Sequence, residues 1–201
     1  MRIFLVNGSP KPKRSVSENI LNALKEMLPS DSEIVTIRYK DVDESIFESA
    51  DTIVFAFPLY VDSLPAHLIK MLEQMETVDK NPDLKIYSII NNGFFESRQS
   101  RHAAKVMKHW CNHTDVEYSG CLCIGAGPTF GMSPMEAYPM KEIGESMDKL
   151  SQAITDKRSA GDIYSEPNLS KDGYAKSGND GWIKAARKRG LTEENLYGKI
   201  H

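Results

Sequence analysis

Two well-known phosphate-binding patterns are missing from this chain. It contains neither G-x-G-x-x-G, the spacing of dinucleotide-binding Rossmann folds, nor G-x-x-x-x-G-K-[ST], the spacing of P-loop nucleotide triphosphatases. Neither of these nucleotide sites is therefore expected. Any phosphate site in this protein has to be built from other loop residues.

The chain also lacks a long apolar run, a strong net charge and a disulfide framework. No stretch of about 18 residues is continuously apolar, and the N-terminus enters a strand-like segment without a signal-peptide pattern. The formal net charge of -3 over 201 residues supplies no strong field for nucleic acid or an anionic membrane. The three cysteines, Cys111, Cys121 and Cys123, suit a reducing compartment. We therefore expect a cytoplasmic protein that binds neither nucleic acid nor membrane.

Short apolar runs alternate with amphipathic segments over most of the chain. The runs that indicate strands are residues 2–7, 33–38, 51–57, 84–90 and 120–125. The segments with helical spacing begin near residues 16, 65, 97 and 139, and residues 41–50 form a short helix or turn. Strands separated by helix-length segments are typical of a parallel sheet covered on both faces. The prediction is a doubly wound, five-stranded parallel α/β sheet in three α/β/α layers.

The last part of the chain has a different composition. From about residue 158 it is rich in Gly, Ser, Asn, Asp and Lys, with one apolar and basic patch at 182–189. We expect a domain over residues 1–157 and a C-terminal extension over 158–201. Two interpretations of the extension stay open: a flexible tail, or a helix that docks on the body or on a partner subunit.

The first strand is followed by a loop rich in serine and lysine. Ser15 and Glu18 have the S-x-x-E spacing of a capping box, which predicts that a helix begins at Val16. The N-terminus of a helix presents unpaired N–H groups that suit a phosphate, and Ser9 and Ser17 add hydroxyls. Serines at such a junction also serve simply as caps and turn formers, so this loop leaves both interpretations open.

Three unusual loops are predicted to meet at one edge of the sheet. They follow the first, third and fourth strands at residues 8–17, 58–64 and 91–96. Ligands of open α/β sheets bind outside the carboxyl ends of the strands, where the strand order reverses. The first loop suits a phosphate, whereas the second and third suit a planar ring with polar heteroatoms. A phosphate joined to a flat heteroaromatic ring describes FMN.

The residues of these loops resemble the NAD(P)H-dependent FMN reductases of the flavodoxin-like fold. The resemblance covers roughly residues 1–156, and its most specific part is P-L-Y-x-D-x-L-P at 58–65. It implies bound FMN, NAD(P)H as co-substrate and a homo-oligomer, either a dimer or a tetramer. It also implies a set of FMN-binding residues: Ser9, Lys11, Ser15, Val16 and Ser17 at the phosphate, and Pro58, Leu59, Tyr60, Val61, Asn91, Asn92, Gly93 and Phe94 at the ring.

The chain departs from this family's pattern in its first loop. Relatives often have arginine where Lys11 stands, and lysine recognises a phosphate less specifically than arginine does. The loop is also long, so the contact to the phosphate is open between Lys11, Lys13 and Arg14. The cysteine cluster that binds an iron–sulfur centre in some relatives is absent there, which excludes that subgroup.

The resemblance leads to a hypothesis about mechanism. Hydride passes from NAD(P)H to FMN and then to a small acceptor, such as a quinone, a nitro or azo compound, or a free flavin, by a ping-pong scheme. The flavin performs this chemistry, so no catalytic side chain is predicted. A non-catalytic FMN-binding electron carrier or flavin-binding module is the alternative.

A metal site is the third possibility that the residues raise. His109, Cys111 and His113 lie close together in sequence, but Cys111 falls on a different face of a helix from the two histidines. We interpret them as surface histidines and a core cysteine, and no metal ligand is predicted.

Overall fold

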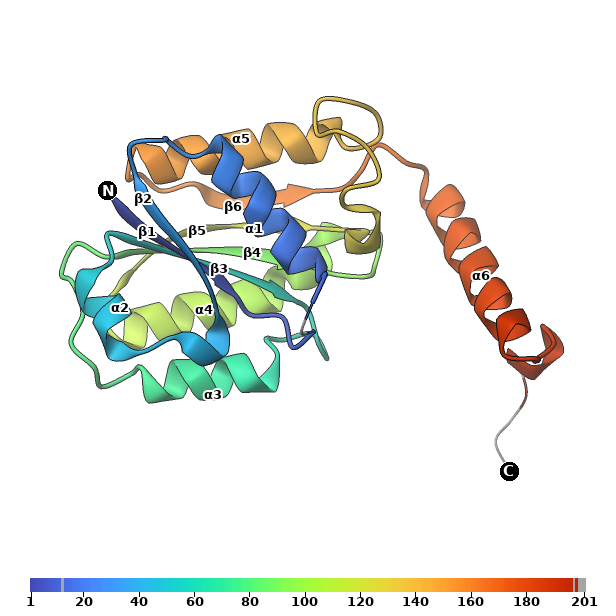
Figure 1. Cartoon of the computed structure of the whole chain (residues 1–201), viewed down its shortest axis with the longest axis horizontal. Coiled ribbons are helices and arrows are strands. Elements are labelled where there is room, and N and C mark those ends of the chain that lie inside the picture. The colour runs from blue at the N-terminus through green and yellow to red at the C-terminus, as the bar shows by residue number, and fades with distance from the viewer. Residues whose placement is uncertain (12, 197, 199–201) are drawn as a thin grey trace. The chain divides into compact units, whose positions relative to one another are not determined.

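Six parallel strands form one sheet in the computed structural model, which describes residues 1–11, 13–196 and 198 (Figure 1). Their order across the sheet is β2-β1-β3-β4-β5-β6. The strands are β1 (Arg2–Asn7), β2 (Glu33–Arg38), β3 (Thr52–Pro58), β4 (Lys85–Asn91), β5 (Glu117–Ile124) and β6 (Gly161–Ser165). The α-helices are α1 (Val16–Met27), α2 (Glu44–Ser49), α3 (Ala66–Gln74), α4 (Arg101–His113), α5 (Lys141–Thr155) and α6 (Lys171–Lys188). The short 3₁₀ turns are η1 (Tyr39–Asp41), η2 (Ser97–Ser100), η3 (Gly127–Thr129) and η4 (Glu194–Leu196).

The parallel α/β sheet was predicted correctly, but the prediction of five strands was wrong. The sixth strand, β6, pairs with β5 in parallel from Gly120↔Gly161 to Ile124↔Ser165. It comes from the segment that was expected to be an extension. Among its five residues, only Ile163 and Tyr164 have large apolar side chains. An edge strand can form without a long apolar run, so little in the sequence indicates it.

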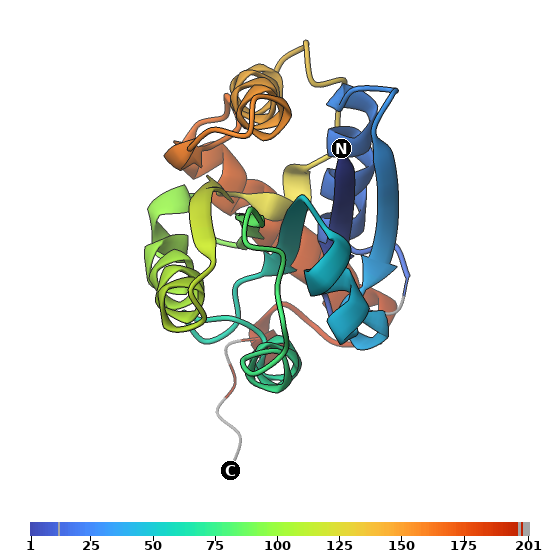
Figure 2. The same ribbon diagram turned by 90° about the vertical axis from the view of Figure 1, so that its left-hand side faces the viewer.

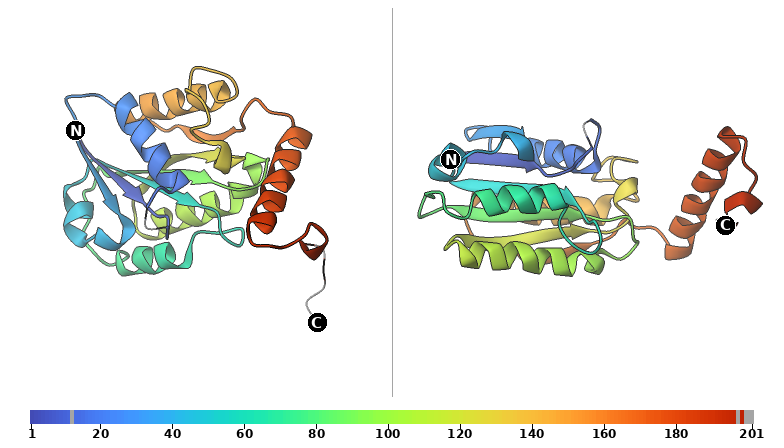
Figure 3. Two further views of the ribbon diagram at one scale, coloured as in Figure 1. Left: turned by 45° about the vertical axis from the view of Figure 1, so that its right-hand side comes forward. Right: turned by 90° about the horizontal axis from the view of Figure 1, so that it is seen from below.

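Helices cover both faces of the sheet, which produces two hydrophobic cores. One core packs α2, α3 and α4 against Phe4, Phe55 and Phe57, and the other packs α1 and α5 against Leu5 and Val54. The end-on view shows these layers, and α3 and α4 lie side by side on one face (Figures 2 and 3). β3 lies between β1 and β4 and sends alternate side chains into each core. This position explains its nearly continuous apolar sequence.

The first helix begins where its capping residues predict. Ser15 is the N-cap, its hydroxyl accepts from the N–H of Glu18, and the Glu18 carboxylate accepts from the N–H of Ser15. The capping box and the start of α1 at Val16 are thus confirmed. Because the helix start is held by its own residues, the end of the first loop has a defined position relative to β1.

The second compact unit, residues 169–201, contains α6. Ser170 caps this helix by accepting from the N–H of Gly173 at 3.0 Å. At the other end Gly190 has a φ of 74°, and the N–H of Leu191 donates to the carbonyl of Ala186 at 3.0 Å. These are the features of a Schellman C-cap. The helix therefore begins and ends at signals within its own sequence.

In the first compact unit, residues 1–168, Asp51 connects three parts of the chain at the amino-terminal edge of the sheet. Its carboxylate accepts from the backbone N–H of Arg2 at 2.7 Å and from Nζ of Lys157, after α5, at 2.7 Å. Its backbone carbonyl accepts from the N–H of Lys85 at the start of β4. The hydrogen bond from Lys157 is the main cause that lowers the pKa of Asp51, and the hydrogen bond from Arg2 is the second.

We expect Asp51→Asn to lower the free energy of unfolding at pH 7 by about 1 kcal/mol, because the pair is partly exposed and screened by solvent. A lowered folded-state pKa contributes stability above the ordinary value of 3.8, and this contribution is lost as the pH falls through the lowered pKa. The difference between the two proteins should therefore shrink in acid. Urea unfolding at several pH values measures it, with the exposed Asp31→Asn as control. A constant difference down to the lowest pH would contradict this account.

Candidate functional site

The loops predicted to meet at one edge of the sheet do start there. In the strand register Asn7 pairs with Ala56, Pro58 pairs with Asn91, and Asn91 pairs with Ile124. The carboxyl ends of β1, β3, β4 and β5 are therefore neighbours. The following loops share this edge, which is where parallel sheets bind ligands.

The serine hydroxyls of the first loop are buried in its structure. Ser9 and Ser15 are each 3% exposed, and Ser17 is 1% exposed. The Ser9 hydroxyl accepts from the N–H of Lys11 at 3.3 Å, and the Ser15 hydroxyl accepts from the N–H of Glu18 at 3.0 Å. Each hydroxyl keeps its own proton for a further acceptor. These serines shape the loop, and their contact with a phosphate stays a prediction.

The start of α1 and the cations of the loop are the features that favour an anion. The N–H groups of Val16 and Ser17 belong to the first turn, where helix geometry provides no intrahelical acceptor. Lys11, Lys13 and Arg14 are all exposed. Exposed cations beside the positive end of a helix dipole make this part of the surface attractive to a phosphate. Which of the three cations would contact the anion stays open.

Asn91, the last residue of β4, joins the first loop to β3. Its side chain is buried and donates through Nδ2 to the Ser17 hydroxyl at 3.0 Å and to the Phe57 carbonyl at 3.1 Å. Its backbone carbonyl accepts from the N–H of Leu59 at 2.8 Å. We expected this amide to face ring heteroatoms, but both of its N–H groups are used within the protein. Asn91 therefore sets the relative positions of three loops.

The second loop contains a tight turn with an unusual backbone. The N–H of Tyr60 donates to the Ser63 carbonyl, and the N–H of Ser63 donates to the Tyr60 carbonyl, both at 3.0 Å. Val61 and Asp62 between them have φ values of 49° and 57°. Positive φ at both central positions defines a type I′ turn, which normally requires Asn or Gly. Val61 is 99% exposed and Tyr60 is 49% exposed.

The third loop presents a buried amide and an exposed aromatic ring. Asn92 is 3% exposed and donates through Nδ2 to the Ser100 hydroxyl at 2.9 Å. Among the described residues, its Oδ1 is one of a few buried side-chain atoms without a hydrogen-bond partner. Phe94 is 54% exposed, and a Cβ at Gly93 would meet no protein atom within 4 Å. The loop thus has an unused acceptor and open space at its glycine.

The loop after β5 is packed against the third loop through backbone contacts. The N–H of Ala126 donates to the Phe94 carbonyl at 2.5 Å, and the N–H of Gly127 donates to the Asn92 carbonyl at 2.7 Å. A Cβ at Gly125 would lie 2.0 Å from the carbonyl oxygen of Phe95, so only glycine fits there. The loop after β5 thus holds the backbone of the third loop, while the Phe94 side chain stays exposed.

Sequence analysis missed two residues that support the first loop. The guanidinium of Arg38, at the end of β2, donates to the carbonyls of Ser9 at 3.1 Å and Lys11 at 3.2 Å. His67 in α3 lies with Nε2 2.9 Å from the Gly8 carbonyl, and its ring contacts that of Tyr39 at a centroid distance of 4.0 Å and a tilt of 43°. A charged residue at the carboxyl end of a predicted strand was the only signal for Arg38.

Glu166 is a third residue that sequence analysis did not identify. Its Oε1 accepts from the N–H of Ser97 at 2.7 Å and from the Ser97 hydroxyl at 2.5 Å. Ser97 begins η2, which leads into α4. The residues after β6 thus support the start of this helix, although they were assigned to an extension.

The three cysteines are buried in the core, whereas His109 and His113 lie at the surface. Burial raises the pKa of the Cys111 thiol to about 12. The pKa of Cys121 is also raised, mainly by its hydrogen bond with Cys123 and secondly by burial. Both thiols are therefore neutral at physiological pH. His113 lies 3.9 Å from the carboxylate of Glu76 and is largely exposed. In the described part of the chain, no group of three or more His, Cys, Asp and Glu residues is arranged to hold a metal ion.

The sheet order and its two helical layers define the class of protein to which this fold belongs. Parallel strands in the order 2-1-3-4-5, with the site at the β1/β3 edge, are the flavodoxin-like arrangement, here extended by β6. No protein-family model matches the chain, and no curated protein matches it in sequence. Solved structures do match it, at identities that establish the fold alone.

Three of these structures illustrate the likeness. A flavodoxin from Streptococcus pneumonia is 16% identical with a TM-score of 0.61, covering 78% of this chain and 99% of that chain. An FMN-dependent NADH-azoreductase from Bacillus anthracis, in complex with FMN, is 14% identical with a TM-score of 0.56, covering 77% and 100%. An NADPH-quinone reductase from P. pentosaceus is 17% identical with a TM-score of 0.55, covering 75% and 98%.

The backbone of the Tyr60–Ser63 turn provides a test of strain at this edge. A β-branched residue in the left-handed region costs on the order of 1–2 kcal/mol, whereas asparagine tolerates it. The Val61 side chain is 99% exposed, so its replacement removes little packing. We expect Val61→Asn to raise the free energy of unfolding by about 1 kcal/mol, measured by thermal unfolding of the ligand-free protein.

The matched control is Val61→Thr, which makes the side chain more polar but keeps its branched Cβ. It should leave stability nearly unchanged, because the backbone strain persists. Equal stabilisation by both substitutions would assign the effect to removal of an exposed apolar group and contradict the strain interpretation.

Proposed function

We propose that this protein is an FMN-dependent oxidoreductase that passes hydride from NAD(P)H through bound FMN to a small acceptor. The single observation that carries the proposal is the composition of one sheet edge. The start of α1 and its cationic loop lie at the end of β1, and the exposed aromatic residues Tyr60 and Phe94 follow β3 and β4. A phosphate group and a planar ring are the two chemical features that such an edge accommodates.

The solved structures support the proposal by analogy of fold. Two of the neighbours described above are named as reductases that use NADH or NADPH, and one of them is in complex with FMN. Further neighbours are an azoreductase from another Bacillus anthracis strain and an NADH:FMN oxidoreductase. Because one fold can host several functions, this analogy adds to the argument from the loops but does not replace it.

The residues at the edge fit FMN in their chemistry. The first loop supplies Ser9, Lys11, Ser15, Val16 and Ser17 for the phosphate. The Pro58–Val61 loop supplies an apolar and aromatic wall, and the Asn91–Phe94 loop supplies the opposite wall. The unpartnered Oδ1 of Asn92 could accept from a ring N–H, and the open space at Gly93 lets a ligand approach the backbone. All of these contacts are proposals.

In this proposal the protein positions its ligands, and FMN supplies the hydride chemistry when bound. The first loop anchors the phosphate, and the buried Asn91 junction fixes the distance between that anchor and the walls of the ring. The exposed Tyr60 and Val61 leave one side accessible to a nicotinamide and then to an acceptor. This shared access is the geometric basis for a ping-pong scheme, and no side chain is assigned a catalytic role.

The carrier alternative is separated from the reductase by one experiment. The purified protein is saturated with FMN under anaerobic conditions, and NADH or NADPH is added in separate samples. We expect rapid bleaching of the flavin absorption with at least one nucleotide, compared with free FMN at the same concentration. Bound flavin that keeps its absorption would indicate a carrier or binding module. Failure to take up FMN would contradict the site itself.

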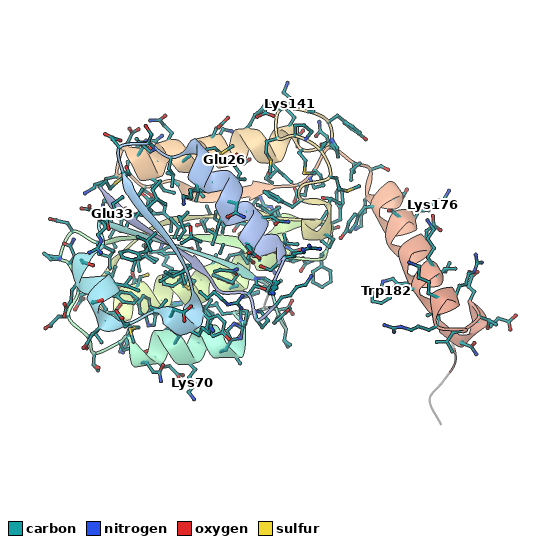
Figure 4. The ribbon with its side chains drawn as sticks, viewed as in Figure 1. Glu26, Glu33, Lys70, Lys141, Lys176 and Trp182 are labelled. Atoms are coloured by element: carbon teal, nitrogen blue, oxygen red, sulfur yellow. The ribbon has the colours of Figure 1, made fainter. Side chains whose placement is uncertain are left out.

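We also propose that the chain is a cytoplasmic homo-oligomer held together by α6. Residues 169–201 contain seven Lys and Arg and four Asp and Glu, whereas residues 1–168 contain eighteen and twenty-four. The basic segment and the acidic body are thus complementary in charge between copies. Trp182 is 70% exposed, and Figure 4 shows it projecting from a different side of α6 than Lys176. Two interior glycines, Gly178 and Gly181, weaken this helix by about 1 kcal/mol each, and contacts with a second copy would offset this cost.

Sedimentation of the full chain tests this proposal. We expect the wild-type protein to form a dimer or tetramer, Trp182→Ala to weaken association by at least about tenfold, and Trp182→Phe to keep most of it. High salt should also weaken association. A monomeric wild type, or a Trp182→Ala variant of unchanged mass and affinity, would contradict the role of α6.

A further inference from the structure

Arg38 forms a fork between β2 and the first loop. Its Nη2 donates to the carbonyl of Ser9 at 3.1 Å, and both Nη1 and Nη2 lie 3.2 Å from the carbonyl of Lys11. β2 pairs with β1 through Asn7↔Arg38, so the arginine is placed at the start of the loop by strand register. The planar guanidinium can thus hold two carbonyl groups at once.

These two carbonyls are the groups that would oppose an anion in the loop. A carbonyl oxygen carries a partial negative charge, and it repels a phosphate oxygen when it points into a binding site. The cation of Arg38 draws the oxygens of Ser9 and Lys11 toward β2. The loop can then present hydroxyl and N–H groups to a ligand.

The Arg38 fork reaches the middle of the first loop, whose ends are held by other contacts. Lys11, Lys13 and Arg14 are exposed, and Arg14 has a φ of 54°. At its ends the loop is held by the bond between the Gly8 carbonyl and His67 and by the capping box at Ser15. Arg38 reaches the part between these two ends.

We propose that Arg38 is a positioning residue that arranges the first loop for a phosphate group. The proposal rests on the proposed FMN site for its effect on binding, but its effect on the loop can be measured without any cofactor. Because Arg38 acts on backbone carbonyls through a planar fork, lysine should replace it only in part. Removing it should affect recognition of the phosphate and leave recognition of the ring intact.

The first experiment uses trypsin and the ligand-free protein. Lys13 and Arg14 are cleavage sites within the loop, and Lys70 in α3 is an internal reference for unfolding of the body. We expect Arg38→Ala to raise the rate of cleavage after Lys13 and Arg14 by about tenfold relative to cleavage after Lys70, as loss of a charged hydrogen bond predicts. Mass spectrometry of the fragments measures both rates.

The matched control is Lys40→Ala, which removes an exposed cation two residues further along the chain. It should leave the cleavage ratio unchanged. Equal ratios in wild type and Arg38→Ala would overturn the proposal, and so would an equal rise of cleavage at all three sites, because that pattern reports general unfolding.

The second experiment compares two flavins by fluorescence titration. FMN carries the phosphate, whereas riboflavin has the same ring without it. Arg38→Ala should raise the Kd for FMN by about tenfold and change that for riboflavin by less than about twofold. Arg38→Lys should recover only part of the loss, and Lys40→Ala should match the wild type.

The outcomes separate this proposal from the proposed function. Full recovery of FMN affinity in Arg38→Lys would show that a positive charge alone suffices, and it would overturn the role assigned to the planar guanidinium. An equal loss for both flavins would assign Arg38 a general structural role and would also overturn it. A wild-type protein that binds neither flavin would contradict the FMN site, while the trypsin experiment would still decide the action of Arg38 on the loop.

Discussion

The candidate site depends on the side-chain amide of Asn91. This buried group donates to the Ser17 hydroxyl in the first turn of α1 and to the Phe57 carbonyl of β3, while its own residue ends β4. Three segments that are distant in sequence are thereby held at one point. Loss of these bonds would leave buried polar groups unpaired, which costs more than the bonds themselves contribute. The positions of the first loop and of the loops after β3 and β4 relative to one another therefore follow from this junction.

Around this junction the site combines a rigid base with an accessible rim. Asn91 and Asn92 are nearly fully buried, and the close approach of Gly125 to Phe95 ties the loop after β4 to the loop after β5. Tyr60 and Phe94 remain about half exposed. Binding sites on loops depend on such support from a packed scaffold. The site edge thus presents exposed aromatic side chains on a backbone that is held from below.

Much of the fold was predictable because its signals are local. The apolar run of β3 marks a strand buried on both faces, and Ser15 with Glu18 marks the start of α1. β6 was missed because its five residues have little apolar character, and the strand forms through its backbone pairing with β5. The positive φ of Val61 could not be predicted from the sequence either, since valine disfavours this conformation. An observed backbone outlier of this kind points toward function.

By itself the sequence determined the first five strands with the helices between them, the capped start of α1 and the three unusual loops that follow β1, β3 and β4. These follow from periodicity and capping within a few residues. Tertiary structure decided that Asn91 bonds to Ser17, that Arg38 bonds to Ser9 and that His67 meets Gly8. Such hydrogen bonds join residues that lie far apart in the chain. They exist only after strand register has brought their backbones together, so no local pattern in the sequence specifies them.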